Sequence, residues 1–258
     1  MTPRGTCAFT LLAALLLALP VPTAAQRAPA VSQLHLPAEV LSLACAPRLA
    51  PSVPDRTLSV VGGQDSFIRR IHAPGDLITL NAGTEQGLEV GQEFYVRRMA
   101  AAGVDGRVQG VPNLMHTVGW IRVYAVDPTM SLATVTHACD TIEIGDHLAP
   151  FALPEVPPAS TDAGKPTAGD YGRILTGANN RQVYGDGDYI IVDRGSAHGV
   201  APGSRFVIYH DKNQPENFLY ELGEAVALEV SESSALLQVM VARDVLSAGD
   251  LVGLRRPE

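Results

Sequence analysis

The chain contains an internal repeat, and this repeat constrains the fold more than any other feature of the sequence. Segment 76–96 aligns with segment 188–208 without a gap, at an offset of 112 residues (188 − 76 = 112). Glycines recur in the same register because sharp corners between strands need a residue that tolerates positive φ. The coinciding residues are Gly75, Gly83, Gly87, Gly91 and Phe94 in the first copy and Gly187, Gly195, Gly199, Gly203 and Phe206 in the second.

A second block of the repeat matches independently of the first. Segment 118–126 aligns with segment 222–230 at an offset of 104 (222 − 118 = 104), and the same offset places Gly145-Asp146 on Gly249-Asp250. The two offsets differ by eight residues (112 − 104 = 8), so the first copy carries an insertion. We expect this insertion around Ala100–Leu114, as a long hairpin loop.

Each copy consists of short apolar segments rich in Val, Ile, Leu and Tyr, separated by Gly, Asp and Pro turn signals. A helical period is absent, apart from a short turn near Ala38–Cys45. The pattern predicts an all-β fold of two tandem small five- to six-stranded β-barrels. The expected strands are 77–80, 93–96, 119–126, 131–136 and 147–150 in the first copy, and 189–192, 205–209, 223–230, 235–241 and 251–254 in the second.

The N-terminal residues 1–25 have the pattern of a secretory signal peptide. An apolar run over Phe9–Leu19 is too short to span a bilayer, and Thr23-Ala24-Ala25 offers a cleavage site. The mature protein is therefore expected in the periplasm or outside the cell, without a transmembrane segment. The further expected divisions are a leader arm (26–55), repeat 1 (56–152), a Pro-rich linker (153–169) and repeat 2 (170–258).

Two cysteines remain once Cys7 is removed with the signal peptide. In an oxidising compartment this number predicts one disulfide, between Cys45 in the leader arm and Cys139 in the first copy. The alternative is two separate buried thiols. Cys139 aligns with Arg243, so the second copy has no equivalent cross-link.

Charge and spacing exclude several functional classes. The net charge is −8 and no basic stripe occurs, which argues against nucleic acid and anionic membranes as partners. The histidines lack the spacing of zinc sites, and Ser196 with His198 lacks the surroundings of a catalytic nucleophile. Asp146 and Asp250 each follow a glycine, which favours a role in turns over calcium binding. We expect no catalytic residue, metal or cofactor.

Trp120 is the only tryptophan and lies on an expected strand of the first copy, two residues before Tyr124. One interpretation makes it an anchor in a core or a domain interface. The other makes Trp120 and Tyr124 an aromatic strip that stacks on sugars. The equivalent position in the second copy is Glu224.

The glycine pattern resembles known families. The run Gly83, Gly87-Leu88, Gly91, Gly119, Ser131 and Gly145-Asp146 is similar to the C-terminal barrel domain of bacterial flagellar assembly protein T. It is more distantly similar to the twin barrels of the rod-shape protein MreC. The resemblance covers about 80 residues in each copy and implies small β-barrels of the bacterial cell envelope. The membrane helix and coiled coil of MreC-like proteins are absent from the pattern here.

These observations favour a non-catalytic exported envelope protein that acts as a binding or structural scaffold module. Its expected partner is an envelope protein or cell-wall glycan. One alternative is a carbohydrate-binding module that uses Trp120 and Tyr124. The other is a hydrolase with a site between the barrels, where domain interfaces form pockets.

Overall fold

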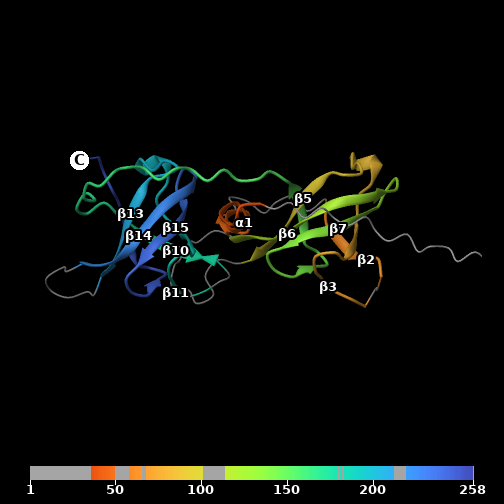
Figure 1. Cartoon of the computed structure of the whole chain (residues 1–258), viewed down its shortest axis with the longest axis horizontal. Helices are drawn as coiled ribbons and strands as arrows, with labels where there is room; N and C mark the ends of the chain where they lie inside the picture. Colours follow the sequence, from red (N-terminus) through yellow and green to blue (C-terminus); the bar gives the residue numbers. More distant parts are fainter. Residues whose placement is uncertain are drawn as a thin grey trace, which may run out of the picture. The chain divides into compact units, whose positions relative to one another are not determined.

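The computed structural model describes residues 36–49, 58–65, 68–100, 114–178, 181, 183–211 and 219–257. Strands dominate this part of the chain (Figure 1). The predicted all-β fold with two β units is confirmed. The expected signal peptide and most of the expected insertion at 100–114 lie outside the described residues. Among those described, no helix is both long and apolar enough to cross a lipid bilayer.

The first β unit is a sheet that curls into a half-barrel (Figure 1). Its two edges approach each other, because Ser59 bridges His147 and Leu148 N donates to Leu58 O at 2.9 Å. A short strand, β1 (Arg48–Leu49), pairs with β6. Along the sheet the strands follow the order β2 (Val60–Gly63), β4 (Leu77–Leu80), β7 (Ser131–Ala138), β6 (Leu114–Val126), β5 (Glu93–Ala100) and β9 (His147–Pro150).

The second β unit is a closed barrel with the same strand order. Closure occurs between the first and last strands, where Tyr171 pairs with Gly253 and Arg173 with Leu251. Two-stranded ribbons, β3 (Ile71–His72) with β8 (Ile142–Glu143) and β11 (Val183–Tyr184) with β16 (Leu246–Ser247), accompany the two units. Around the barrel the strands are β10 (Tyr171–Gly177), β12 (Tyr189–Val192), β15 (Ala235–Ala242), β14 (Leu219–Val230), β13 (Arg205–Asp211) and β17 (Leu251–Leu254).

The repeat extends to the first strand of each unit, which the sequence pattern did not reveal. In β2 the register shifts between Val60 and Gly62, and in β10 it shifts in the same way between Ile174 and Thr176. These bulges break the alternation of polar and apolar residues on which strand prediction depends. Val60 and Ile174 are nevertheless fully buried, and both accept a hydrogen bond from the glycine of the Gly-Asp turn.

Each unit has its own apolar core made by inward-facing side chains of alternate strand positions. The outward-facing positions differ between the two copies. The first core contains Val60, Ile78, Leu80, Val96, Val118, Ile121, Val123, Ala133, Val135 and Leu148, and the second contains Ile174, Ile190, Val192, Phe206, Ile208, Ala225, Ala227, Leu237, Val239 and Val252.

The linker 153–169 packs along the second unit. Ser160 N donates to Gly203 O at 2.7 Å, and Gly164 N donates to Arg256 O at 2.9 Å. Backbone hydrogen bonds of this kind fix the path of a Pro-rich segment. The linker therefore forms part of the second unit's surface.

The corner glycines stand where the chain reverses between strands. Gly87 and Gly199 have φ of +79° and +78° after equivalent 3₁₀ turns. Gly83 has an extended φ and is constrained instead by close approach, since an added Cβ would lie 2.0 Å from Asp127 O. An added Cβ at Gly195 would likewise lie 2.3 Å from Ser231 O. At each of these corners, the backbone of one turn therefore packs directly against the backbone of another.

We expect Gly83→Ala to lower the free energy of unfolding by about 1–3 kcal/mol, because backbone must move to admit the methyl group. Gly62→Ala is the matched control, since an added Cβ at Gly62 meets no atom within 4 Å. That substitution should be neutral or stabilise the strand by roughly 0.5–1 kcal/mol. Urea denaturation of the two variants measures both effects. Equal stability of the variants would contradict the close approach at Gly83.

Candidate functional site

Helix α1 (Ala38–Ala44) of the leader arm covers part of the outer face of the first unit. Its side chain at Ala44 is buried with Tyr95 of β5 and Trp120 of β6. No side chain caps its N-terminus, and a helix of seven residues is too short to be stable alone. Packing on the sheet therefore stabilises it. We call this assembly the arm clamp; its members are α1, Cys45, Tyr95, Trp120, His137, Cys139 and Phe151.

Aromatic rings fill the arm clamp. Trp120 is 6% exposed; its indole meets Tyr95 edge to face at 6.1 Å and stacks on His137 at 4.2 Å. Phe151 packs against Tyr95 at 4.8 Å, and the Tyr95 hydroxyl donates to Ala152 O at 2.8 Å. Burial raises the pKa of Tyr95, as expected for a phenol removed from water. The site is a packed anchor for the arm.

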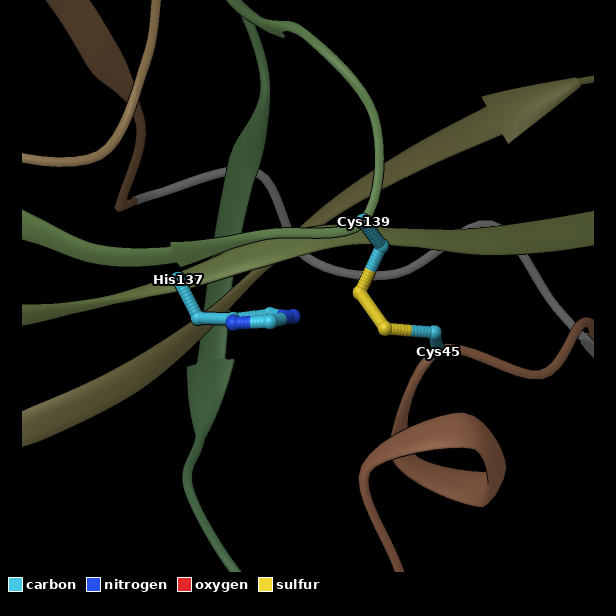
Figure 2. Close-up of side chains that lie close together, drawn as sticks. All are labelled: Cys45, His137 and Cys139. Atoms are coloured by element: carbon cyan, nitrogen blue, oxygen red, sulfur yellow. A yellow bond between two sulfur atoms is a disulfide. The ribbon is translucent and has the colours of Figure 1, made fainter. Parts of the chain in front are cut away.

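The predicted disulfide between Cys45 and Cys139 is confirmed, with the Cα atoms 5.7 Å apart (Figure 2). It closes a loop over a sequence separation of 94 and ties the end of α1 to the end of β7. The imidazole of His137 points toward the two sulfur atoms (Figure 2). Its nearest ring nitrogen and both sulfurs lie within 4.8 Å of one another, a juxtaposition that the sequence analysis missed.

The position of Trp120 decides between its two interpretations. A sugar-stacking platform needs an accessible ring face, whereas the indole of Trp120 is covered by His137, Tyr95 and the arm. Tyr124 is 43% exposed and would have to act without it. Trp120 is an anchor between the arm and the sheet, and we do not propose the aromatic strip.

The second copy has different residues on the equivalent outer face. Glu224 replaces Trp120 and accepts hydrogen bonds from Arg205 at 2.7 Å and Arg255 at 3.1 Å. Burial acts to raise the pKa of Glu224, but Arg255 and Arg205 together outweigh it, so the pKa is lowered. Val241 replaces His137 and is 45% exposed. Part of this face is covered by the linker, since Arg255 donates to Ala163 O at 3.0 Å and an added Cβ at Gly253 would lie 2.7 Å from Pro166.

In each unit, the aspartate of the Gly-Asp turn connects this turn to the neighbouring strand through hydrogen bonds. Asp146 is 3% exposed and accepts hydrogen bonds from Arg98 Nε at 2.8 Å and from Glu143 N at 2.7 Å. Asp250 is bonded to His210 Nδ1 at 2.7 Å and accepts from its own turn. Arg98 and His210 are equivalent positions of the repeat. Each buried carboxylate thus has a cationic or hydrogen-bonding partner from the neighbouring strand.

Asp76 and Asp188 are hydrogen-bonded in a similar way, each to the backbone of its own turn and to an arginine side chain. Asp76 accepts from Ala73 N and from Arg69, and Asp188 accepts from Gly185 N and from Arg181. The sequence pattern did not single out Arg69 and Arg181, although these two arginines are also separated by the repeat offset of 112. That recurrence is the signal that could have identified them.

A pocket of about 240 Å³ lies beside the disulfide. Burial lowers the pKa of its His116, against an opposing effect of Asp140. Ser42 and Tyr189 also line this pocket, and a hydrogen bond joins their side chains.

His198 lies outside this pocket. Its Nδ1 accepts a hydrogen bond from Gly195 N at 3.3 Å, so His198 caps its own turn beside Ser196.

The protein families and curated proteins with which the chain was compared include no match. The resemblance to flagellar assembly protein T and MreC thus extends to small β units and stops there.

We expect replacement of both disulfide cysteines by serine to loosen the arm clamp. Unfolding should become easier by as much as about 4–5 kcal/mol in the chain-entropy model for so long a loop. Acrylamide should then quench Trp120 fluorescence more strongly, because the arm no longer covers the indole. Each single variant, Cys45→Ser or Cys139→Ser, should match the double variant, since either removes the same bond. Unchanged quenching would show that the disulfide does not hold the arm.

The buried histidines predict a loss of stability on mild acidification. Burial lowers the pKa of His72 and of His116 below the ordinary histidine value of 6.5, so the unfolded chain takes up protons first as the pH falls. The free energy of unfolding should therefore decrease from about pH 6.5 downward. His116→Gln should flatten this decrease, measured by urea denaturation at several pH values. The control His198→Gln keeps the cap, because Gln86 occupies the equivalent position; an identical pH profile for both variants contradicts the assignment.

Proposed function

We propose that this chain is an exported, non-catalytic protein of the bacterial cell envelope that acts as a binding scaffold. Its disulfide favours an oxidising compartment outside the cytoplasm, in agreement with the signal-peptide pattern of residues 1–25. Its turn carboxylates are engaged by partners within each unit. A partner would therefore bind to exposed side chains on the surface of the units.

One observation carries the proposal: the first copy buries apolar outer side chains under α1, whereas the second copy leaves apolar side chains near the end of β15 exposed to solvent. In the first copy the outer face binds an apolar helix, α1, through Trp120. In the second copy three apolar side chains at and beyond the end of β15 are open to solvent, Met240 (53%), Val241 (45%) and Val245 (59%). Exposed apolar clusters of this kind mark interaction sites.

The partner that fits this cluster is a protein segment with an apolar surface. Aliphatic and thioether side chains bind apolar helices in grooves and on sheet faces. They offer a sugar neither a flat aromatic ring nor hydrogen-bonding groups. The ion pairs of Glu224 with Arg205 and Arg255 form a polar border beside the apolar cluster, the arrangement found at the rim of protein interfaces. We therefore favour an envelope protein over cell-wall glycan.

Site-specific photocrosslinking in the native envelope tests this function. A photoreactive residue at Val241 should trap a defined envelope protein, and the complex should form again from the two purified components. The same group at Val61, which is 42% exposed on the first unit, is the matched control and should not trap it. Val241→Asp should weaken the purified complex at least tenfold, which is about 1.4 kcal/mol. Equal trapping at both positions, or a partner that is glycan alone, would refute the proposal.

A further inference from the structure

We propose that reduction of the Cys45–Cys139 disulfide turns the arm clamp into a binding site for Zn²⁺, with His137 as its third protein ligand. The proposal is independent of the scaffold function. It starts from three side chains whose ligand atoms all lie within 4.8 Å of one another (Figure 2).

The backbone places these ligands without rearrangement. His137 lies on β7 and Cys139 directly follows it, two residues on, so both side chains leave the same face of the sheet. Cys45 directly follows α1 and approaches from the arm. Zinc binds sulfur at about 2.3 Å and imidazole nitrogen at about 2.0 Å in tetrahedral geometry, which separates neighbouring ligand atoms by roughly 3.5 Å. Once the sulfurs are no longer bonded, small side-chain movements reach that spacing.

The imidazole of His137 is oriented before any metal arrives. It stacks on the indole of Trp120 with an angle of 20° between the rings, and Figure 2 shows it directed at the sulfurs. The set belongs to the first copy alone, since Val241 and Arg243 occupy the positions of His137 and Cys139 in the second. Two thiolates and one neutral imidazole form a ligand set that zinc prefers.

A dithiol can act as the reductant of the Cys45–Cys139 disulfide. The disulfide takes two electrons and two protons, so its S–S bond breaks and two thiols form, while the dithiol becomes a disulfide. Zn²⁺ then displaces both thiol protons and binds two thiolates and His137, and water completes the coordination. Two thiolates neutralise the ion, which suits a half-buried site. The arm stays attached to β7 in both states, first through a covalent bond and then through the metal.

Cobalt titration of the mature protein tests the site. The protein is reduced with a dithiol, freed of reductant without oxygen and titrated with Co²⁺, a coloured substitute for zinc. The reduced protein should show thiolate-to-cobalt charge transfer and the visible bands of tetrahedral Co²⁺, and Zn²⁺ should abolish both. The oxidised protein should show neither. His137→Ala should bind Co²⁺ at least tenfold more weakly, whereas His116→Ala, beside the neighbouring pocket, should bind as the wild type does.

The fluorescence of Trp120 provides a second readout, which also reports whether reduction disrupts the arm clamp. If reduction alone releases the arm, the emission of this single tryptophan shifts to the red, and Zn²⁺ must restore it in the wild type and not in His137→Ala. Failure of Zn²⁺ to restore it overturns the proposal. The same holds if His137→Ala binds Co²⁺ as tightly as the wild type, or if the oxidised protein binds it equally well.

Discussion

The structure depends on one contact made twice, the close approach of backbone to backbone at Gly83 and at Gly195. At each corner a 3₁₀ turn packs against the turn between β6 and β7 or between β14 and β15, and no side chain fits between the two backbones. This contact fixes where the chain bends and therefore which strands become neighbours. The equivalent bulges of β2 and β10, and the equivalent carboxylates of Asp146 and Asp250, complete the same frame in both units.

The two copies share this frame and differ in what they present outward. Trp120, His137 and Cys139 make the first copy an anchor for the arm, whereas Glu224, Val241 and Arg243 make the second copy unsuitable for it. An indole in place of a carboxylate contributes apolar area that a short helix can bury. The disulfide then reduces the entropy lost when the arm docks. The first copy thus uses its outer face to hold the arm, whereas the second copy leaves apolar side chains near the end of β15 exposed.

The sequence predicted the strands that carry regular alternation or glycine corners, such as β4, β9, β12 and β17, with their observed bounds. It also predicted the pairing of Cys45 with Cys139, because only two cysteines follow residues 1–25, the expected signal peptide. The strands β2 and β10 were missed, since a bulge and embedded glycines disrupt their pattern. The linker's course along the second unit was missed as well, because backbone hydrogen bonds leave no trace in composition.

The candidate site was the part least accessible from sequence. The positions of Trp120 and the cysteines could be singled out by rarity, but the stacking of His137 on Trp120 depends on cross-strand register. A one-residue change in that register would turn the imidazole to the other face of the sheet. Arg98 and His210 were overlooked because they serve one role with different residue types. In each case the missing information is which neighbour lies across the strand.

Hydroxyl-radical footprinting of the oxidised protein, read at Trp120 and Met240, tests the central claim most directly. Both side chains react readily when water reaches them. Trp120 should be strongly protected, while Met240, which is 53% exposed, should react at the rate of an exposed methionine in a peptide. Rapid oxidation of Trp120, or protection of Met240 in the isolated protein, would contradict a covered indole in the first copy and exposed apolar side chains near the end of β15 in the second.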